Sequence, residues 1–406
     1  MADCPYQTLQ KLKVLFMDWN CYGGQDMKAA LRRCGINLSL YPFSPRIERH
    51  DAAFESELTR AVRSSSPDFV FSFNYFPVVS KVCSELETTY VSWVYDNPLV
   101  SLYSYTLANP WNRVFLFDRQ EYLFFRRNGI NTVHYLPLAA APERLGDGAA
   151  SPEIARKYGG DVSFVGSLYT EPKHQLYNRI QNVPAYTRGY LDAVMQAQKR
   201  VYGASFVEET LSDDILSDLR AACPCPPHPY GVETESYLYS NYFLLRQITA
   251  MERAELLRGI GARRPIYLYT NDKSYTSPGC VNRGPVDYYT EAPYVFYHSR
   301  INLNITLRSI KSGIPLRVFD IMGSQGFVLT NYQEDMTDCF VPDEDYVYYA
   351  DEEDLLEKID YYLSHETRRA EIARNGYEKI LRYHTYEHRI PYLFAETPAA
   401  DFISVL

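Results

Sequence analysis

The sequence predicts an α/β protein with two doubly wound parallel sheets and a helical insertion in the second of them. Short apolar segments alternate with helical patterns over the first third of the chain and again after residue 265, and a Gly- and Pro-containing stretch separates the two regions. Alternation of this kind indicates βαβ units and mostly parallel sheets. With 406 residues, the chain can form two or three domains of about 150 residues each.

Composition indicates a globular protein and argues against a nucleic-acid binder. Hydrophobic residues make up 46% of the chain and charged residues 22%, close to the average of folded domains. The 41 basic residues face 50 acidic ones, which gives a net charge of −9. Nucleic-acid binders normally carry a basic surface, so we expect no nucleic-acid partner.

The N-terminus and the cysteines predict a cytoplasmic protein. The first ten residues lack the basic and apolar regions of a signal peptide, and no window approaches 18 uninterrupted apolar residues, so no transmembrane segment is expected. In the cytoplasm the eight cysteines would be reduced thiols. Cys223, Cys225 and His228 lie close in sequence but lack a second ligand pair at zinc spacing, so no metal site is predicted.

The first domain is expected over residues 1–140. Apolar runs predict its parallel strands, and the turn at Gly23-Gly24 leads into a helix over residues 25–34 that Gly35 ends. The predicted strands are residues 13–17, 36–41, 68–73, 89–95, 113–117 and 132–136.

The second domain is expected over residues 161–385, after a linker at 141–160 that contains Gly146, Gly148 and Pro152. Residues 172–260 show no strand pattern and form the predicted helical insertion, and residues 386–406 form a tail. The predicted strands are 161–165, 265–269, 281–286, 301–305, 327–329 and 346–349, and the predicted helices begin near Pro315 or cover 354–363 and 366–383.

A locally basic segment is the strongest candidate site. Residues 292–319 contain no acidic residue but include Arg308, Lys311 and Arg317. Ser312-Gly313 then leads into a helix, whose N-terminus would offer free N–H groups and a partial positive charge. Together these features predict a phosphate or diphosphate site.

Asp320 lies in the same predicted helix. A carboxylate there could accept two hydroxyls of a ribose, as acidic residues do in dinucleotide-binding folds. The alternative is a solvated basic loop in which Asp320 pairs with Arg317 at i, i+3.

Two glycine-containing segments could also approach a phosphate. Gly166-Ser167 and Gly23-Gly24 each follow a predicted strand, although neither belongs to a G-x-G-x-x-G fingerprint. Both could equally be tight turns.

Three carboxylates follow predicted strands and are candidate general bases: Asp18, Asp96 and Asp118. Asp residues at such positions also cap helices or form turns. Asp96 is favoured because its aromatic neighbours would desolvate it and raise its pKa.

Several blocks resemble the CgeB-like, spore-maturation-type glycosyltransferases. The main ones are SGIPLRVFD at 312–320 and GFVLTNY at 326–332, and the similarity continues through DEEDLLEKI at 351–359 and Asn375-Gly376. FVGS at 164–167 and YDNP at 95–98 resemble motifs of the second and first domains of these enzymes.

The resemblance implies a GT-B-like fold, with two Rossmann-like domains facing a central cleft. The second would hold the sugar nucleotide and the first the acceptor. The resemblance implies that Asp320 holds the ribose. It also implies that a set of residues contacts the donor diphosphate, and that Arg317 either belongs to this set or braces the loop. The remaining members of that set are Gly166, Ser167, Arg308, Lys311, Ser312 and Gly313.

The family also bears on stereochemistry and metal use. Related retaining enzymes carry an E-x7-E motif, but Ser312 stands eight positions before Asp320, so retention is not implied. Such enzymes generally need no metal, and we expect neither metal nor cofactor.

We therefore expect a hexosyltransferase-type enzyme that moves a sugar from a nucleotide-diphosphate sugar, expected to be a UDP-sugar, to an unidentified acceptor hydroxyl. If it inverts, Asp96 is the expected base and Asp18 the second choice. A nucleotide-sugar 2-epimerase and a non-catalytic nucleotide-sugar-binding protein are the alternatives.

Overall fold

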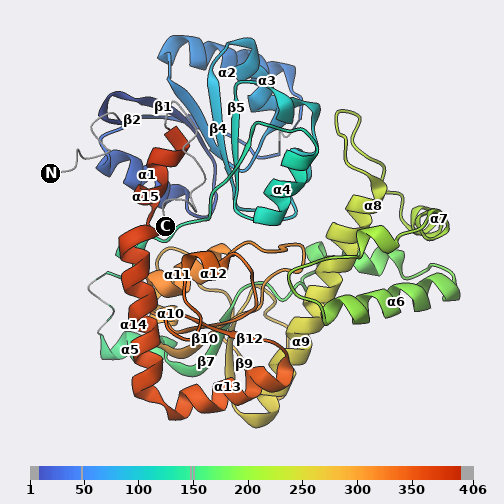
Figure 1. The fold of residues 1–406 in the computed structure, drawn as a ribbon, viewed down its shortest axis with the longest axis vertical. Helices are drawn as coiled ribbons and strands as arrows, with labels where there is room; N and C mark the ends of the chain where they lie inside the picture. The colour runs from blue at the N-terminus through green and yellow to red at the C-terminus, as the bar shows by residue number, and fades with distance from the viewer. Residues whose placement is uncertain (1–8, 47–48, 147–148, 150, 395–406) are drawn as a thin grey trace. The chain divides into compact units, whose positions relative to one another are not determined.

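The structure, a computed structural model, describes residues 9–46, 49–146, 149 and 151–394 (Figure 1). It divides into two compact units. The first unit therefore takes in two later stretches of the chain besides the predicted N-terminal domain. It comprises Met1–Ala139, Pro227–Glu233 and His384–Leu406, and the second unit comprises Ala140–Pro226 and Thr234–Tyr383.

Six parallel strands form the sheet of the first unit, in the order β2-β1-β3-β4-β5-β6. All six strands predicted for this region are present. Their winding direction reverses between β1 and β3, which is the switch point of such a sheet. The strands are β1 (Lys13–Asp18), β2 (Asn37–Pro42), β3 (Phe69–Phe73), β4 (Thr89–Val94), β5 (Asn112–Leu116) and β6 (Val133–Tyr135).

The helices of the first unit include one from the end of the chain. Helix α15 occupies the start of the region predicted as a tail and packs against α1; residues 395–406 of that tail lie outside the described residues. The helices are α1 (Gly24–Arg33), α2 (Ala52–Ser65), α3 (Pro77–Glu85), α4 (Arg119–Arg127) and α15 (Tyr386–Phe394), with 3-10 turns η1 (Leu9–Lys11), η2 (Val100–Leu102) and η3 (Tyr105–Ala108).

The second unit is built on another six-stranded parallel sheet, in the order β12-β11-β10-β7-β8-β9. Along the chain this is the 3-2-1-4-5-6 order of a doubly wound fold, with its switch point between β7 and β10. The six predicted strands are again present. They are β7 (Gly160–Val165), β8 (Ile266–Tyr269), β9 (Cys280–Asn282), β10 (Ser299–Asn304), β11 (Val328–Asn331) and β12 (Val347–Tyr349).

The helices of the second unit begin inside the segment predicted as a linker, because α5 lies there; Gly148 is outside the described residues. In the described residues 172–260 no strand occurs. The helices are α5 (Pro152–Tyr158), α6 (Ala185–Lys199), α7 (Asp213–Ala222), α8 (Glu235–Leu238), the π-helix η9 (Tyr239–Leu244), α9 (Leu245–Arg263), α10 (Ala292–His298), α11 (Leu316–Gly323), α12 (Met336–Cys339), α13 (Glu352–Ser364) and α14 (Glu366–Tyr383). The 3-10 turns are η4 (Pro142–Leu145), η6 (Pro172–His174), η7 (Leu176–Ile180) and η8 (Glu208–Thr210).

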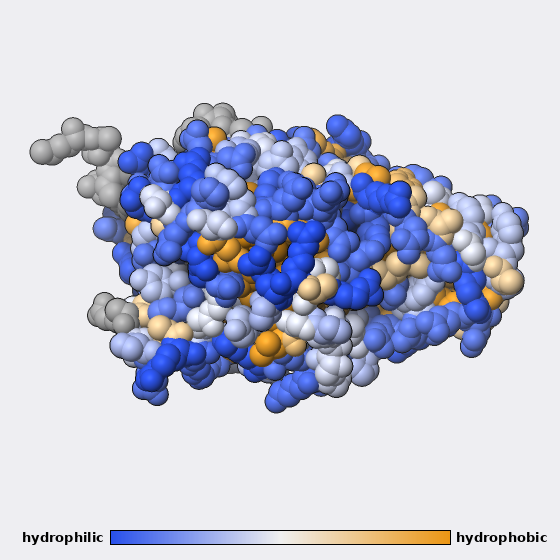
Figure 2. All heavy atoms as spheres, turned by 90° about the horizontal axis from the view of Figure 1, so that it is seen from below, coloured by the Kyte–Doolittle hydropathy of each residue, from blue (hydrophilic) through white to orange (hydrophobic). Residues whose placement is uncertain are grey.

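Each sheet lies in its own apolar core. Leu58, Val70 and Val114 belong to the core of the first unit, and Leu257 and Leu303 to that of the second. The face seen in Figure 2 is mostly hydrophilic, with hydrophobic side chains in small groups. Among the described helices, none is both long and apolar enough to cross a membrane.

Candidate functional site

The carboxyl ends of β7 and β10 mark the expected ligand position in the second unit. The two strands are neighbours, and β8 flanks β7 on the other side. Parallel sheets bind ligands in the crevice outside such a switch point. Gly166 and Ser167 follow β7, and the loop 305–315 follows β10. The structure thus brings the two predicted phosphate-binding segments of this unit to one edge of one sheet.

The turn after β7 is fixed by its own hydrogen bonds. Gly166 has a φ of 153°, which residues with a Cβ rarely adopt. The Ser167 hydroxyl donates to Oε2 of the buried Glu171 at 2.8 Å and accepts the N–H of Tyr169 at 3.0 Å. Ser167 therefore shapes the turn, and a phosphate contact from its hydroxyl stays a prediction.

Arg253 of α9 joins the two loops. Its Nη1 donates to the carbonyl oxygen of Ser167 and its Nη2 to that of Ile305. The buried guanidinium lies 4.9 Å from the ring centre of Tyr169 and 5.3 Å from that of Phe164. Burial lowers the pKa of Arg253. Because these two acceptors are neutral carbonyls, its charge favours an anion near these strand ends.

Arg308, expected at the diphosphate, lies in a buried ion pair. Its Nε and Nη2 donate to the two carboxylate oxygens of Glu252 at 2.7 and 2.8 Å. Further bonds reach the carbonyls of Val201 at 2.9 Å and Lys199 at 2.7 Å, and the guanidinium lies 3.8 Å from the Tyr202 ring centre. Burial lowers the pKa of Arg308, but Glu252 raises it by more. The arrangement anchors the loop after β10, and a diphosphate contact stays a prediction.

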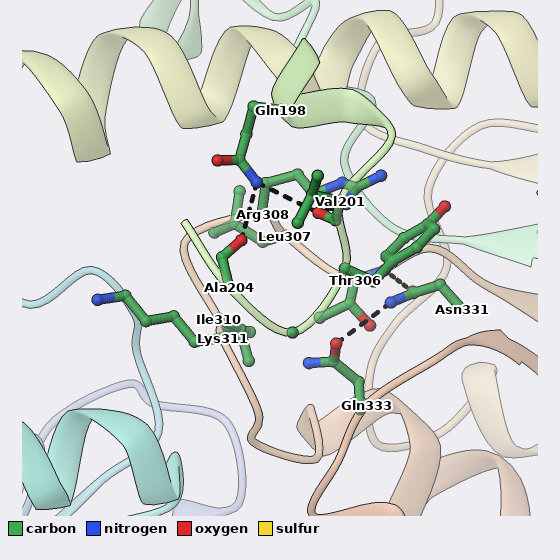
Figure 3. Close-up of a pocket in the computed structure, with 12 residues that line it drawn as sticks. Gln198, Val201, Ala204, Thr306, Leu307, Arg308, Ile310, Lys311, Asn331 and Gln333 are labelled. Carbon is green, nitrogen blue, oxygen red and sulfur yellow. Dashed lines mark hydrogen bonds between the residues drawn. The ribbon is translucent and has the colours of Figure 1, made fainter. Parts of the chain in front are cut away.

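A small open hollow lies beside this ion pair (Figure 3). Arg308, Lys311, Gln198 and Asn331 are among its lining residues. In Figure 3 the Lys311 side chain extends away from the hydrogen-bonded residues of the wall. The Lys311 charge lowers the pKa of Glu208, although burial raises it by more. The hollow thus combines polar side chains with two cations.

The segment before α11 is buried and ordered by main-chain contacts. Pro315 was predicted as the first helical residue. In the structure it is the N-cap of α11, and the first helical residue is Leu316. The carbonyl of Ser312 accepts the Asp335 N–H at 3.0 Å, and that of Gly313 accepts Nε2 of Gln333 at 2.9 Å. Since the main chain is held this way, the N-terminal N–H groups of α11 have a fixed direction.

Asp320 is buried and held by groups outside its helix. Its Oδ1 accepts from Arg144 Nη1 and from the Tyr288 hydroxyl, each at 3.1 Å. The alternative prediction, that Asp320 pairs with Arg317, was wrong. The Arg317 guanidinium instead lies 5.7 Å from the centre of the Phe296 ring. Asp320 therefore has a preset orientation, whereas its contact with a ribose stays a prediction.

In the first unit, Asp18 and the glycine pair lie at the end of β1. Asp18 is the last residue of that strand, and its carboxylate pairs with the Lys28 ammonium at 2.8 Å. Gly23 has a φ of 72° and caps α1, which begins at Gly24. A side chain on Gly23 would collide with the Tyr386 hydroxyl. The predicted helix N-terminus is thus at the β1/β3 switch point.

Asp96 follows β4, next to the end of β3. Its Oδ2 accepts from Nδ2 of Asn74 at 2.7 Å. Oδ1 of Asn74 accepts the N–H groups of Tyr95 at 3.1 Å and Asp96 at 3.2 Å. The rings of Trp19 and Tyr95 stack with centres 6.4 Å apart, and burial, then the Asp96 charge, raise the pKa of Tyr95. The Tyr95 ring thus lies close enough to feel the Asp96 charge, and a role of Asp96 as general base stays a prediction.

Asp118, the third carboxylate, caps α4. Its side chain accepts the N–H groups of Gln120 at 3.0 Å and Glu121 at 3.2 Å. The helix-cap alternative is confirmed for this residue. In the described part of the chain, no three potential metal-ligating side chains come together. No disulfide is found among the seven described cysteines, and Cys4 lies outside that part.

Sequence reasoning missed Asn74, Arg144, Glu171 and Arg253. For two of them a signal was available. Asn74 directly follows an apolar strand, and Arg253 lies one helical turn before the core residue Leu257, where a charge is unusual. Arg144 lies in the short 3-10 turn η4 and Glu171 directly precedes η6, and neither segment has a hydrophobic pattern that would single it out.

Comparison with known proteins bears on the family and the fold. Residues 244–395 match the family described as glycosyl transferase-like. The sequence matches none of the curated proteins with which it was compared.

Solved structures resemble the whole chain at low identity. Anabaena HepE in complex with UDP-glucose is 11% identical, with a TM-score of 0.51 over 94% of this chain and 98% of that one. The sucrose-phosphate synthase of Thermosynechococcus elongatus is 10% identical, with a TM-score of 0.49 over 93% and 96% of the two chains. A glycosyltransferase from Rickettsia africae is 9% identical, with a TM-score of 0.48 over 93% and 95%.

The fold prediction is confirmed, since two six-stranded parallel sheets with their helices match GT-B glycosyltransferase structures. The chain has the GT-B fold, and its residues 244–395 match the glycosyl transferase-like family.

Proposed function

We propose that the protein transfers a sugar from a nucleotide-diphosphate sugar to an acceptor hydroxyl. One observation carries the proposal: Arg253 bonds to carbonyls of both loops at the β7/β10 switch point, where its charge favours an anion. It lies within the glycosyl transferase-like region. The resemblance of 312–320 to CgeB-like enzymes further supports it, and the UDP-glucose bound by HepE favours a UDP-sugar.

At this site the second unit would hold the leaving group. The acceptor oxygen forms a bond to the anomeric carbon while the bond from that carbon to the diphosphate oxygen breaks, and its electron pair leaves with the nucleoside diphosphate. Lys311, Arg317 and the N–H groups at the start of α11 would stabilise this charge. Asp320, held by Arg144 and Tyr288, would accept the ribose hydroxyls.

The first unit would hold the acceptor. In an inverting reaction the Asp96 carboxylate takes the proton of the acceptor hydroxyl and later gives it to solvent. Asp18 is the second candidate, but its carboxylate already pairs with Lys28. Asp96 is therefore the base of choice.

A thermal-shift panel with UDP, GDP, dTDP, ADP and CMP tests the donor site. A ligand at 100 times its Kd stabilises the native state by about 2.7 kcal/mol. We expect one nucleoside diphosphate to raise the Tm of the wild type but not of Asp320→Ala. Asp360→Ala is the control. It removes an exposed carboxylate on α13 that pairs with Arg264, and it should respond like the wild type.

A panel in which no nucleotide raises the Tm contradicts the proposal. Turnover then separates the alternatives. A transferase releases nucleoside diphosphate when acceptor is present, whereas a 2-epimerase converts the donor alone without that release. A binding protein would show the thermal shift with no turnover.

A further inference from the structure

Asn74 occupies a special backbone position directly after β3. Its φ is 58°, in the left-handed region that Asn tolerates better than most residues. Its side chain is buried, with the residue 3% exposed. Through that side chain it contacts Tyr95 and Asp96. A buried asparagine with a left-handed backbone conformation beside a proposed base is therefore a candidate for a functional role.

The Asn74 amide holds Asp96 at two points and the preceding residue, Tyr95, at a third. Nδ2 donates to the carboxylate Oδ2 at 2.7 Å. Oδ1 accepts the main-chain N–H groups of Asp96 at 3.2 Å and of Tyr95 at 3.1 Å. Because the main-chain N–H and the carboxylate of Asp96 are both bonded to the same amide, the Asp96 side chain cannot rotate freely.

Asn74 is itself fixed to the sheet. Its N–H donates to the carbonyl of Trp93 at 3.0 Å, and its carbonyl accepts the Ser72 hydroxyl at 2.7 Å. That hydroxyl lies 2.6 Å from the Tyr90 hydroxyl oxygen, which also accepts the Phe76 N–H at 3.1 Å. Because this chain of bonds runs through the ends of β3 and β4, it transmits the rigidity of the sheet to the amide.

We propose that Asn74 is the positioning residue that orients the Asp96 carboxylate toward the acceptor hydroxyl and keeps it ionised. This rests on the proposed function, in which Asp96 accepts the hydroxyl proton. A neutral amide donor favours the carboxylate over the carboxylic acid but adds no full positive charge. Asp18 differs, since an ammonium lies 2.8 Å from it.

Two of the titratable groups near Asp96 stay neutral in the relevant pH range. Burial raises the pKa of Cys21 to about 12, and Lys28, Asp18 and Asp96 all act on that thiol. Burial and the Asp96 charge likewise raise the pKa of Tyr95. Cys21 and Tyr95 therefore stay neutral between about pH 5 and pH 9. Of the two carboxylates that act on Cys21, Asp96 is bonded to Asn74 and Asp18 pairs with Lys28, so a shift of the acidic limb in an Asn74 variant would report Asp96.

The test compares Asn74→Gly with Glu87→Gly. Glycine accepts a positive φ without strain, so Asn74→Gly removes the amide and keeps the main chain. Glu87 is the matched control: its φ is 52°, it is exposed, and it precedes β4 at the end remote from Asp96. Activity is the release of nucleoside diphosphate from the sugar nucleotide, UDP-glucose in the first instance.

We expect Asn74→Gly to lower kcat about ten- to a hundredfold, the order found when a supporting hydrogen bond is lost, with the donor KM unchanged. Its acidic limb should move to higher pH, because the lost donor had favoured the ionised carboxylate. Glu87→Gly should match the wild type. Asn74→Asp puts a second carboxylate beside Asp96 and should move the acidic limb of the pH–rate profile to still higher pH.

Three outcomes overturn the inference. If Asp96→Asn abolishes activity while folded Asn74→Gly keeps the wild-type kcat and pH profile, Asn74 has no positioning role, although the proposed function stands. If Asp96→Asn stays fully active, the base itself fails, and the inference with it. A crystal structure of Asn74→Gly or Asn74→Asp with an unmoved Asp96 carboxylate also contradicts it, without any assay.

Discussion

At the scale of single residues, Arg308 illustrates how far a charge pattern can be interpreted. The absence of acidic residues over 292–319 predicted that its charge would be available to a ligand. In the structure Glu252, 56 positions away, neutralises it. The local sequence contains no information about a partner at that separation. Asp320 shows the same limit, since its partner Arg144 is 176 positions away.

We expect Arg308→Met to destabilise the protein by about 3–5 kcal/mol, because it leaves Glu252 charged and buried without its partner. Urea unfolding measures this change. Arg368→Met is the control: it breaks an exposed pair with Glu371, with side chains 40% and 45% exposed, and should cost about 0–1 kcal/mol. Unchanged stability together with loss of nucleotide binding would instead assign Arg308 to the diphosphate.

At the scale of elements, helices held by distant contacts escaped prediction. The sequence over 386–394 contains Pro391, which normally breaks a helix, and the region was predicted as a tail. In the structure it is α15. Phe394 packs against Phe69 at 5.5 Å, and Arg389 donates to the Pro137 carbonyl at 2.9 Å. Strands with continuous apolar runs, such as β3, needed no such contacts and were predicted correctly.

Helix α9 supports the proposed donor site through Arg253. Arg253→Met would release the carbonyls of Ser167 and Ile305, so the two loops would lose their shared anchor. We expect the Kd for UDP to rise about tenfold or more, as measured by calorimetry. Arg258→Met, exposed on the same helix, should bind UDP like the wild type. Equal affinity in both variants would show that Arg253 does not support the site.

At the scale of the whole molecule, the two parallel, doubly wound sheets followed from the alternation of elements, whereas the membership of the two units did not. The stretch Pro227–Glu233 belongs to the first unit, although the sequence placed it in the helical insertion of the second domain. Its place is fixed by Arg49 and Glu233, which pair at 3.1 Å with side chains 3% exposed. A pair 184 positions apart leaves no periodic signal in the sequence.

The stability of the molecule should fall on acidification. Hydrogen bonds from the Tyr158 hydroxyl and the Asp287 N–H hold the pKa of Glu291 at about 2, below its ordinary 4.5. The hydrogen bond from Arg220 lowers the pKa of Glu235. Hydrogen bonds from Ser274 and Thr170 lower the pKa of Asp272. A lowered pKa stabilises the native state above the ordinary value, and this contribution is lost as the pH falls through the native one.

We therefore expect the Tm to decrease progressively from about pH 5 to pH 2, as followed by circular dichroism. Glu291→Gln should show a shallower decrease over the same range, because it cannot titrate. An equally steep decrease in Glu291→Gln would show that Glu291 contributes nothing to the acid sensitivity.

The central claim is that the β7/β10 switch point of the second unit binds the donor nucleotide. A crystal structure with UDP tests it most directly. The account predicts the diphosphate between Gly166-Ser167 and the N-terminus of α11, with the ribose hydroxyls on Asp320. UDP bound elsewhere on the chain, with Asp320 still on Arg144 and Tyr288 and no ligand beside it, would contradict the account.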